Sequence, residues 1–166
     1  MRTILGCIAL SALALCGCNS AQPPAAVAPS VAPPFNTVTD LKQLMSWVID
    51  PATDVVWASV GTIVTTEGRQ EIAPRTDDEW TAVRNNAAIV AESGNLLMLP
   101  GHARNQDDWM VKARGLIDSA SEAIKAAEVK DSEALFTAGG DIYQACTNCH
   151  AKYLIGEAAP APAAAP

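Results

Sequence analysis

The sequence predicts an all-α domain, an up-down-up-down four-helix bundle, and three observations support this prediction. Apolar residues recur at helical spacing in four segments. Hydrophobic residues make up 49% of the chain and aromatic residues only 5%, so the core should consist mostly of Ala, Leu, Val and Ile, which favours packed helices over an aromatic-rich sandwich. Strand-like alternation occurs only at residues 61–66, which we expect to form an irregular connection.

The first predicted helix spans about residues 38–61. Proline removes a backbone donor and crowds the preceding turn, so Pro51 should kink this helix. Its apolar positions, which follow the helical period, are Leu41, Leu44, Met45, Val48, Ala52, Val55 and Val56.

The second and third predicted helices have clear start signals. Thr76 and Glu79 have the spacing of a capping box, and Pro100 should end the helix that they begin. The third helix should run from about residue 107 to 127, because Asp107 and Asp108 would complement the helix dipole in its first turn.

The fourth predicted helix begins near Asp131 and carries an inward stripe of apolar and sulfur-containing residues. Gly139 and Gly140 interrupt it, and since glycine weakens a helix, we expect them to permit close packing by a neighbour. The inward stripe consists of Leu135, Ile142, Cys146, Cys149 and Tyr153.

Residues 1–17 are predicted to be the signal peptide of a lipoprotein. An apolar stretch follows Arg2 and is too short to span a bilayer. The segment Leu15-Cys16-Gly17-Cys18 resembles a bacterial lipobox, in which the last cysteine is diacylated and becomes the new N-terminus. The alternative is ordinary cleavage near Ala21 without a lipid. Either route exports the chain.

Uncharged Ala/Pro-rich segments flank the predicted domain. We expect residues 18–35 to be a tether, residues 36–157 to be the folded domain and residues 158–166 to be a disordered tail. Lipidation of Cys18 predicts a periplasmic protein attached to a membrane, and Asn19 in the next position favours the outer membrane. The net charge of −7 and the lack of Lys/Arg clusters argue against binding of nucleic acid.

The segment Cys146-Thr147-Asn148-Cys149-His150 is typical of covalent haem attachment. Positions i and i+3 share a helix face, so both sulfurs can form thioethers with the two porphyrin vinyl groups. His150 would then be the proximal ligand of the iron. The alternatives are a strained local disulfide, a zinc site, which needs about four N or S ligands, and a redox dithiol, which would be expected in a βαβ context.

A haem motif on the last helix of an all-helical domain resembles the class II cytochromes c, the family that contains cytochrome c′ and the low-spin cytochromes c556. The resemblance covers about residues 38–155. It implies Cys146 and Cys149 as the thioether sites of one haem c, His150 as the proximal ligand, and a residue of the first helix on the other side of the iron.

Met45 is the candidate for that sixth ligand. Only 16 residues follow His150, and they include no Met or His, so the ligand must lie upstream. In an up-down-up-down bundle, Met45 would be level with His150, although it could also be a core methionine that fills space beside the haem. The other candidates are Met98, Met110 and His102, the last of which we expect to be exposed in a loop.

Other residues are expected near the haem. Lys42 and Lys152 could meet the haem propionates at the bundle end. The tryptophans at or next to inward helical positions, which we expect to pack in the core or at the haem edge, are Trp47, Trp57, Trp80 and Trp109.

The predicted function is one-electron transfer, with no enzymatic activity. A haem with His and Met ligands has no open coordination site and a raised potential. One alternative is a five-coordinate protein that binds NO or CO, with Met45 merely near the iron, and another is a lipoprotein without haem. The expected partners are redox proteins and a membrane reached through the lipid, and both a monomer and a dimer stay open.

Overall fold

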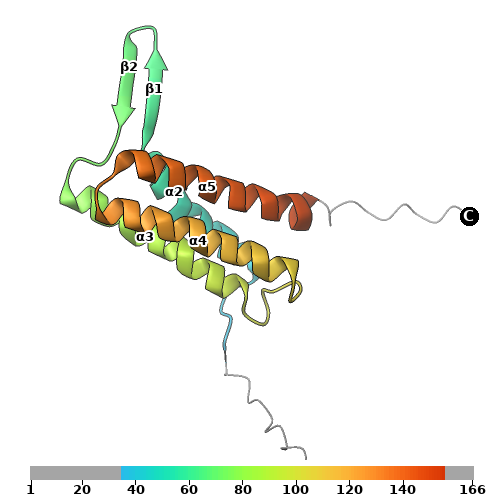
Figure 1. The fold of residues 1–166 in the computed structure, drawn as a ribbon. Coiled ribbons are helices and arrows are strands. Elements are labelled where there is room, and N and C mark those ends of the chain that lie inside the picture. The colour runs from blue at the N-terminus through green and yellow to red at the C-terminus, as the bar shows by residue number, and fades with distance from the viewer. Residues whose placement is uncertain (1–34, 156–166) are drawn as a thin grey trace, which may run out of the picture. The chain divides into compact units, whose positions relative to one another are not determined.

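A computed structural model describes residues 35–155, and 69% of these residues are helical (Figure 1). The predicted signal peptide and the predicted tail lie outside the described residues, as does all of the tether, Cys18 included, except Phe35. The elements are α1 (Leu41–Leu44), η1 (Met45–Ile49), α2 (Asp50–Ala58), β1 (Gly61–Thr65), β2 (Gly68–Ile72), α3 (Asp77–Leu97), α4 (Asp108–Glu128), α5 (Ser132–His150) and η2 (Ala151–Ile155).

The helix starts follow from capping side chains. The predicted capping box of α3 is confirmed, because the Thr76 hydroxyl accepts from the Glu79 N–H and the Glu79 carboxylate accepts from the Thr76 N–H. Asp40 and Gln43 form a second capping box at α1, and the Asp131 carboxylate accepts from two N–H groups in the first turn of α5.

The first predicted helix is divided by the π-helical turn η1. The Asp50 N–H bonds to the carbonyl of Met45, five residues back, instead of four. We expected a kink at Pro51, and the irregularity instead lies in the turn before it, where the proline ring would crowd the carbonyl of Trp47. The wider turn changes the angle between successive side chains. Trp47, which we expected to pack inward, is 63% exposed.

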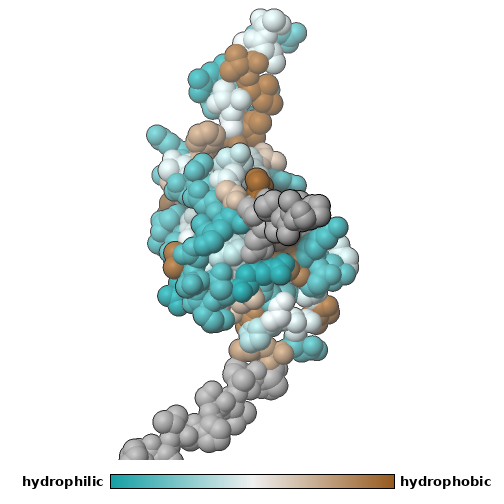
Figure 2. Space-filling model, turned by 90° about the vertical axis from the view of Figure 1, so that its right-hand side faces the viewer, coloured by the Kyte–Doolittle hydropathy of each residue, from teal (hydrophilic) through white to brown (hydrophobic). Residues whose placement is uncertain are grey.

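Residues 61–66 were predicted to form an irregular connection, and this prediction was wrong. They contribute β1, which pairs antiparallel with β2 so that Gly61 is opposite Ile72 and Thr65 is opposite Gly68. Four β-branched residues in β1 and a glycine after the two-residue turn favour this hairpin. It stands clear of the helices (Figure 1), and apolar side chains lie along it (Figure 2).

The core has the predicted composition. Of the twenty buried apolar residues within residues 35–155, nine are alanines and nine are Leu, Ile or Val. Small side chains let helices approach closely, and Gly94 of α3 lies directly against Ala113 and Ile117 of α4. Helix α4 packs against both α3 and α5 (Figure 1). Over the same residues, no helix combines the length and the hydropathy needed to cross a membrane.

Candidate functional site

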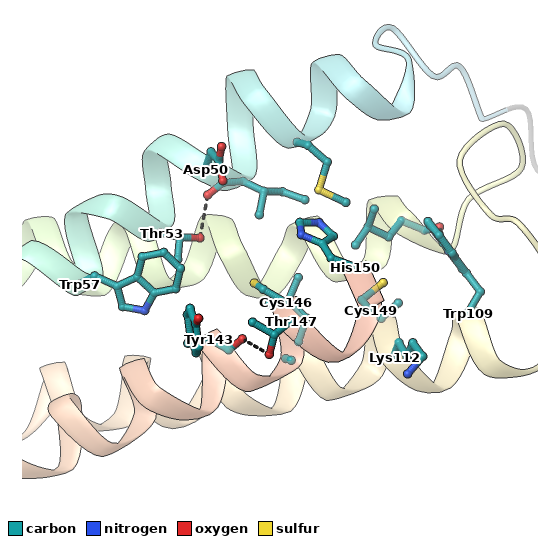
Figure 3. A pocket seen from close by; sticks show the side chains of 16 residues that line it. Asp50, Thr53, Trp57, Trp109, Lys112, Tyr143, Cys146, Thr147, Cys149 and His150 are labelled. Atoms are coloured by element: carbon teal, nitrogen blue, oxygen red, sulfur yellow. Dashed lines mark hydrogen bonds between the residues drawn. The ribbon is translucent and has the colours of Figure 1, made fainter. Parts of the chain in front are cut away.

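Cys146, Cys149, His150 and Met45 line one pocket of about 220 Å³ (Figure 3). The two cysteines and the histidine come from the last two turns of α5, and Met45 comes from η1, about 100 residues earlier in the chain. In Figure 3 the His150 ring points into the pocket toward the helix that carries Asp50, and Cys146 and Cys149 lie on the α5 side. The fold therefore brings together all of the predicted ligand residues that lie within its described part.

The pocket walls are mainly apolar and come from four segments of the chain. Besides the predicted ligands, its lining includes Ile49, Leu97, Ala113, Leu116 and two tryptophans. Trp57 and Trp109 lie at opposite ends of the pocket (Figure 3).

Hydrogen bonds fix both tryptophans. The Trp57 Nε1–H donates to the carbonyl of Gly139 at 2.9 Å, and the Trp109 Nε1–H donates to the carbonyl of Leu97 at 2.6 Å. Tyr153, three residues after His150, packs edge-on against Trp109 with ring centroids 4.9 Å apart. These contacts fix the orientation of the aromatic walls of the pocket.

A second pocket of about 500 Å³ adjoins the first. Met45, Trp109, Cys149 and His150 line both pockets, so these side chains form the boundary between the two. The second pocket falls within the range of about 300–1,000 Å³ that is typical of small-molecule sites, whereas the first is smaller. Together they give the predicted ligands open space on two sides.

The two thiols are free and half-buried. Burial raises the pKa of the Cys146 thiol, and the nearby Cys149 and Asp50 add to this effect. Burial also raises the pKa of the Cys149 thiol, although the charge of Lys112 on α4 opposes it. Both cysteines are therefore neutral thiols at pH 7, as expected of sulfurs in apolar surroundings.

His102 was expected to be exposed, and this prediction was wrong. The side chain is 4% exposed. Its Nδ1 lies 2.9 Å from the carbonyl oxygen of Leu96, and its Nε2 lies 2.7 Å from that of Thr39. Because both ring nitrogens are engaged by the backbone, His102 is occupied by a structural role.

Met98 and Met110 are half-buried against the core and line neither pocket. Among the methionines at 45, 98 and 110, Met45 alone reaches the cysteines and His150. Within residues 35–155, no three His, Cys, Asp or Glu side chains gather as a group that could hold a metal ion.

The basic residues near the site differ in part from those predicted. Lys42 lines the second pocket, but Lys152 is ion-paired with Asp108 of α4. This pairing lowers the pKa of Asp108 and raises the pKa of Lys152. Arg104 also lines the second pocket and was not predicted, because it lies in an irregular loop whose position no sequence period indicates.

No protein-family model, curated protein or solved structure matches this chain.

Proposed function

We propose that this protein is an exported c-type cytochrome that transfers single electrons through one covalently bound haem. The observation that carries the proposal is the convergence of two thiols, one imidazole and one thioether on a single apolar pocket. The spacing of the thiols and the histidine is that of haem attachment. A methionine thioether, such as that of Met45, commonly binds the iron together with histidine in cytochromes c.

The donor set fits a haem better than the alternatives that the sequence left open. A zinc site was expected to need about four N or S ligands. The thiols and imidazole in the pocket are those of Cys146, Cys149 and His150, Asp50 adds a carboxylate, and the ring nitrogens of the other histidine, His102, are engaged by backbone carbonyls. A redox dithiol would gain from lowered thiol pKa values, whereas burial raises the pKa of both thiols here.

Each thiol would add across one vinyl group, so that sulfur bonds one vinyl carbon and the proton of the thiol goes to the other. This addition involves no net oxidation or reduction. His150 and Met45 would hold the iron, and Lys42 and Arg104 would hold the propionates by charge-assisted hydrogen bonds.

When bound, a haem with His and Met ligands supplies a reversible one-electron couple at raised potential. The residues of the chain would limit the reaction to electron transfer. Leu97, Leu116 and the hydrogen-bonded tryptophans would shield a bound haem from water, and Met45 would hold the iron in place of a diatomic ligand. The residues around the haem would therefore favour an electron carrier without enzymatic activity.

The proposal includes an up-down-up-down four-helix bundle. The segment α1–η1–α2 would be its first member and α3, α4 and α5 the other three. In this arrangement the beginning of the first member lies beside the end of the last, which accounts for the meeting of Met45 with His150 in one pocket.

We further propose that Cys18 is lipidated and tethers the domain to the periplasmic face of the outer membrane. A flexible tether would give one domain reach between membrane-bound partners. After expression of wild type and Cys18→Ala, we expect wild type in the membrane fraction and the variant in the soluble periplasm. A soluble wild type, or an unacylated N-terminus by mass spectrometry, rejects the tether.

Absorption spectra of the protein produced with cytochrome c maturation machinery test the main proposal. We expect a low-spin haem spectrum in both redox states and haem staining on a denaturing gel that is lost in the Cys146→Ala/Cys149→Ala variant. A high-spin spectrum would favour the five-coordinate gas-binding alternative. Absence of haem, or staining undiminished in the double variant, contradicts the proposed attachment.

A further inference from the structure

A second feature of the surface, an aromatic groove, lies between α2 and α5. It has a volume of about 350 Å³ and is lined by Trp57, Val60, Phe136, Gly139, Gly140 and Tyr143. Phe136 is 63% exposed and Tyr143 is 55% exposed. Exposed aromatic side chains around a hollow are typical of the centre of a protein interface.

Two glycines and one hydrogen bond form this groove. The bond from Trp57 Nε1 to the carbonyl of Gly139 holds α2 and α5 together, and a Cβ at Gly139 would lie 3.4 Å from Trp57 Cδ1. At Gly140 a Cβ would meet nothing within 4 Å, so the missing side chain leaves open space. The close helix approach and the hollow therefore have a common origin in the glycine pair.

The aromatic groove is continuous with the candidate haem pocket. Trp57 and Tyr143 line both, and their rings pack edge-on with centroids 6.1 Å apart. Figure 3 shows the two side chains together at one end of the pocket, on the same side as Cys146. A molecule in the groove would thus be separated from the pocket by one layer of aromatic rings.

Acidic side chains flank the groove. Asp50 and Asp54 lie seven and three residues before Trp57, on the same helix face, and Glu133 lies three residues before Phe136. All three carboxylates are exposed, and neither α2 nor α5 contains a Lys or Arg. Near Glu133 the closest basic side chain on the hairpin is Arg69, and it is paired with Glu71.

We propose that the aromatic groove is the docking site of the redox partner, and that this partner presents a lysine- or arginine-rich face around an apolar patch. The inference rests on the proposed function and adds where the partner binds and which charge its contact surface carries. Opposite charges would steer the encounter, and the aromatic groove would give contact close to the haem. The interface would be small and short-lived, as electron-transfer encounters are.

Binding can be measured independently of electron transfer. The haem-loaded, ¹⁵N-labelled protein is titrated with hexaamminecobalt(III), an inert trivalent cation that stands in for basic side chains, and then with a lysine-rich c-type cytochrome. We expect chemical-shift changes at amides of residues 50–60 and 133–143, lost at high salt. Changes centred on α3 or α4 overturn the proposal.

Charge variants test whether the acidic side chains beside the groove attract the partner. Asp54→Asn/Glu133→Gln removes two acids beside the groove, and Glu92→Gln/Glu128→Gln removes two exposed acids from α3 and α4 as the matched control. At low ionic strength, we expect the first pair to slow electron transfer with hexaammineruthenium(III) and with the basic cytochrome about three- to tenfold, and the control pair to leave both rates nearly unchanged. Equal losses in both pairs overturn the proposal.

The apolar contribution is tested with Phe136→Ser. We expect weaker binding of the basic cytochrome and unchanged binding of the small cation, because only a protein contacts the exposed ring. Ferricyanide oxidation and the haem spectrum are recorded for every sample. A variant series with normal haem and no groove-specific effect rejects the docking site while the proposed function stands, whereas a missing haem spectrum rejects the function itself.

Discussion

The Nε2 atom of His102 lies 2.7 Å from the carbonyl oxygen of Thr39, which is 63 residues earlier in the chain. The other ring nitrogen bonds to Leu96 at the end of α3. His102 therefore joins the segment before α1 to the end of α3 and helps to place Met45, six residues after Thr39.

Replacement of His102 should loosen this junction. In His102→Ala two buried carbonyls lose their partner, so the free energy of unfolding should fall by about 2 kcal/mol. Urea denaturation measures this loss. Hydrogen exchange should also accelerate at the amides of Gln43 and Leu44, which bond to Asp40 at the start of α1. Unchanged exchange at these amides would mean that the junction does not hold α1.

Met45 should determine the spin state. Thioether sulfur is a soft ligand that favours ferrous iron, so in Met45→Ala the potential should fall by roughly 100 mV or more, within the ~0.8 V that axial ligands span. The variant should be high-spin and bind carbon monoxide when reduced. Met98→Ala and Met110→Ala are the controls and should stay low-spin, since neither side chain lines the pocket. A low-spin Met45→Ala with unchanged potential would make Met45 a packing residue.

Alanine substitutions at Gly94 and Gly115 allow a matched comparison of stability. Both lie inside helices, but a Cβ at Gly94 would come within 2.9 Å of the Ala113 carbonyl, whereas one at Gly115 would meet nothing within 4 Å. Gly94→Ala should lower the free energy of unfolding by about 1–3 kcal/mol. Gly115→Ala should raise it by about 0.5–1 kcal/mol. Thermal and urea unfolding of the haem-loaded variants would reveal whether the two changes have the expected opposite signs.

The capping box of α3 should make the stability of the protein depend on pH. Hydrogen bonds from the N–H groups of Arg75 and Thr76 lower the pKa of Glu79 below its ordinary value of 4.5. The stabilisation is therefore present above about pH 4.5 and is lost as the pH falls through the lowered folded-state pKa.

Melting temperatures between pH 7 and pH 3 measure this effect. The difference between wild type and Glu79→Gln should shrink below pH 4.5. Thr76→Ala is the comparison and should cost about 1 kcal/mol at pH 7. Its cost should change less with pH, because the Thr76 hydroxyl lowers the pKa of Glu79 less than the two backbone N–H groups do. A difference between wild type and Glu79→Gln that stays constant with pH would contradict the role of the Glu79 carboxylate.

Local signals in the sequence predicted the helices well. Thr76 with Glu79, and Asp131 at the start of α5, mark helix starts because the capping partners lie within four residues. The meeting of Cys146 with Met45 could also be anticipated, from the resemblance to a known family and from the antiparallel order that short connections impose on helices. These predictions depended on short-range patterns or on chain order.

The remaining features depend on distant partners. His102 has no local pattern, and its burial follows from carbonyls at Thr39 and Leu96 that only the folded chain supplies. The hairpin was missed because its second strand contains Arg69, Gln70 and Glu71 and lacks an apolar alternation. The aromatic groove could not be predicted, since it results from the approach of two helices that lie far apart in the sequence.

The π-helical turn η1 affects how this site can change during evolution. Such a turn is geometrically an α-helical turn with one extra residue. Deletion of one codon, for example that of Ser46, would restore the regular winding and rotate Met45 by about 100° relative to α2. The buried face of α2 would keep its place. A lineage could thus gain or lose the proposed sulfur ligand through one insertion or deletion, but Leu44, which is buried just before the turn, would have to repack at the same time.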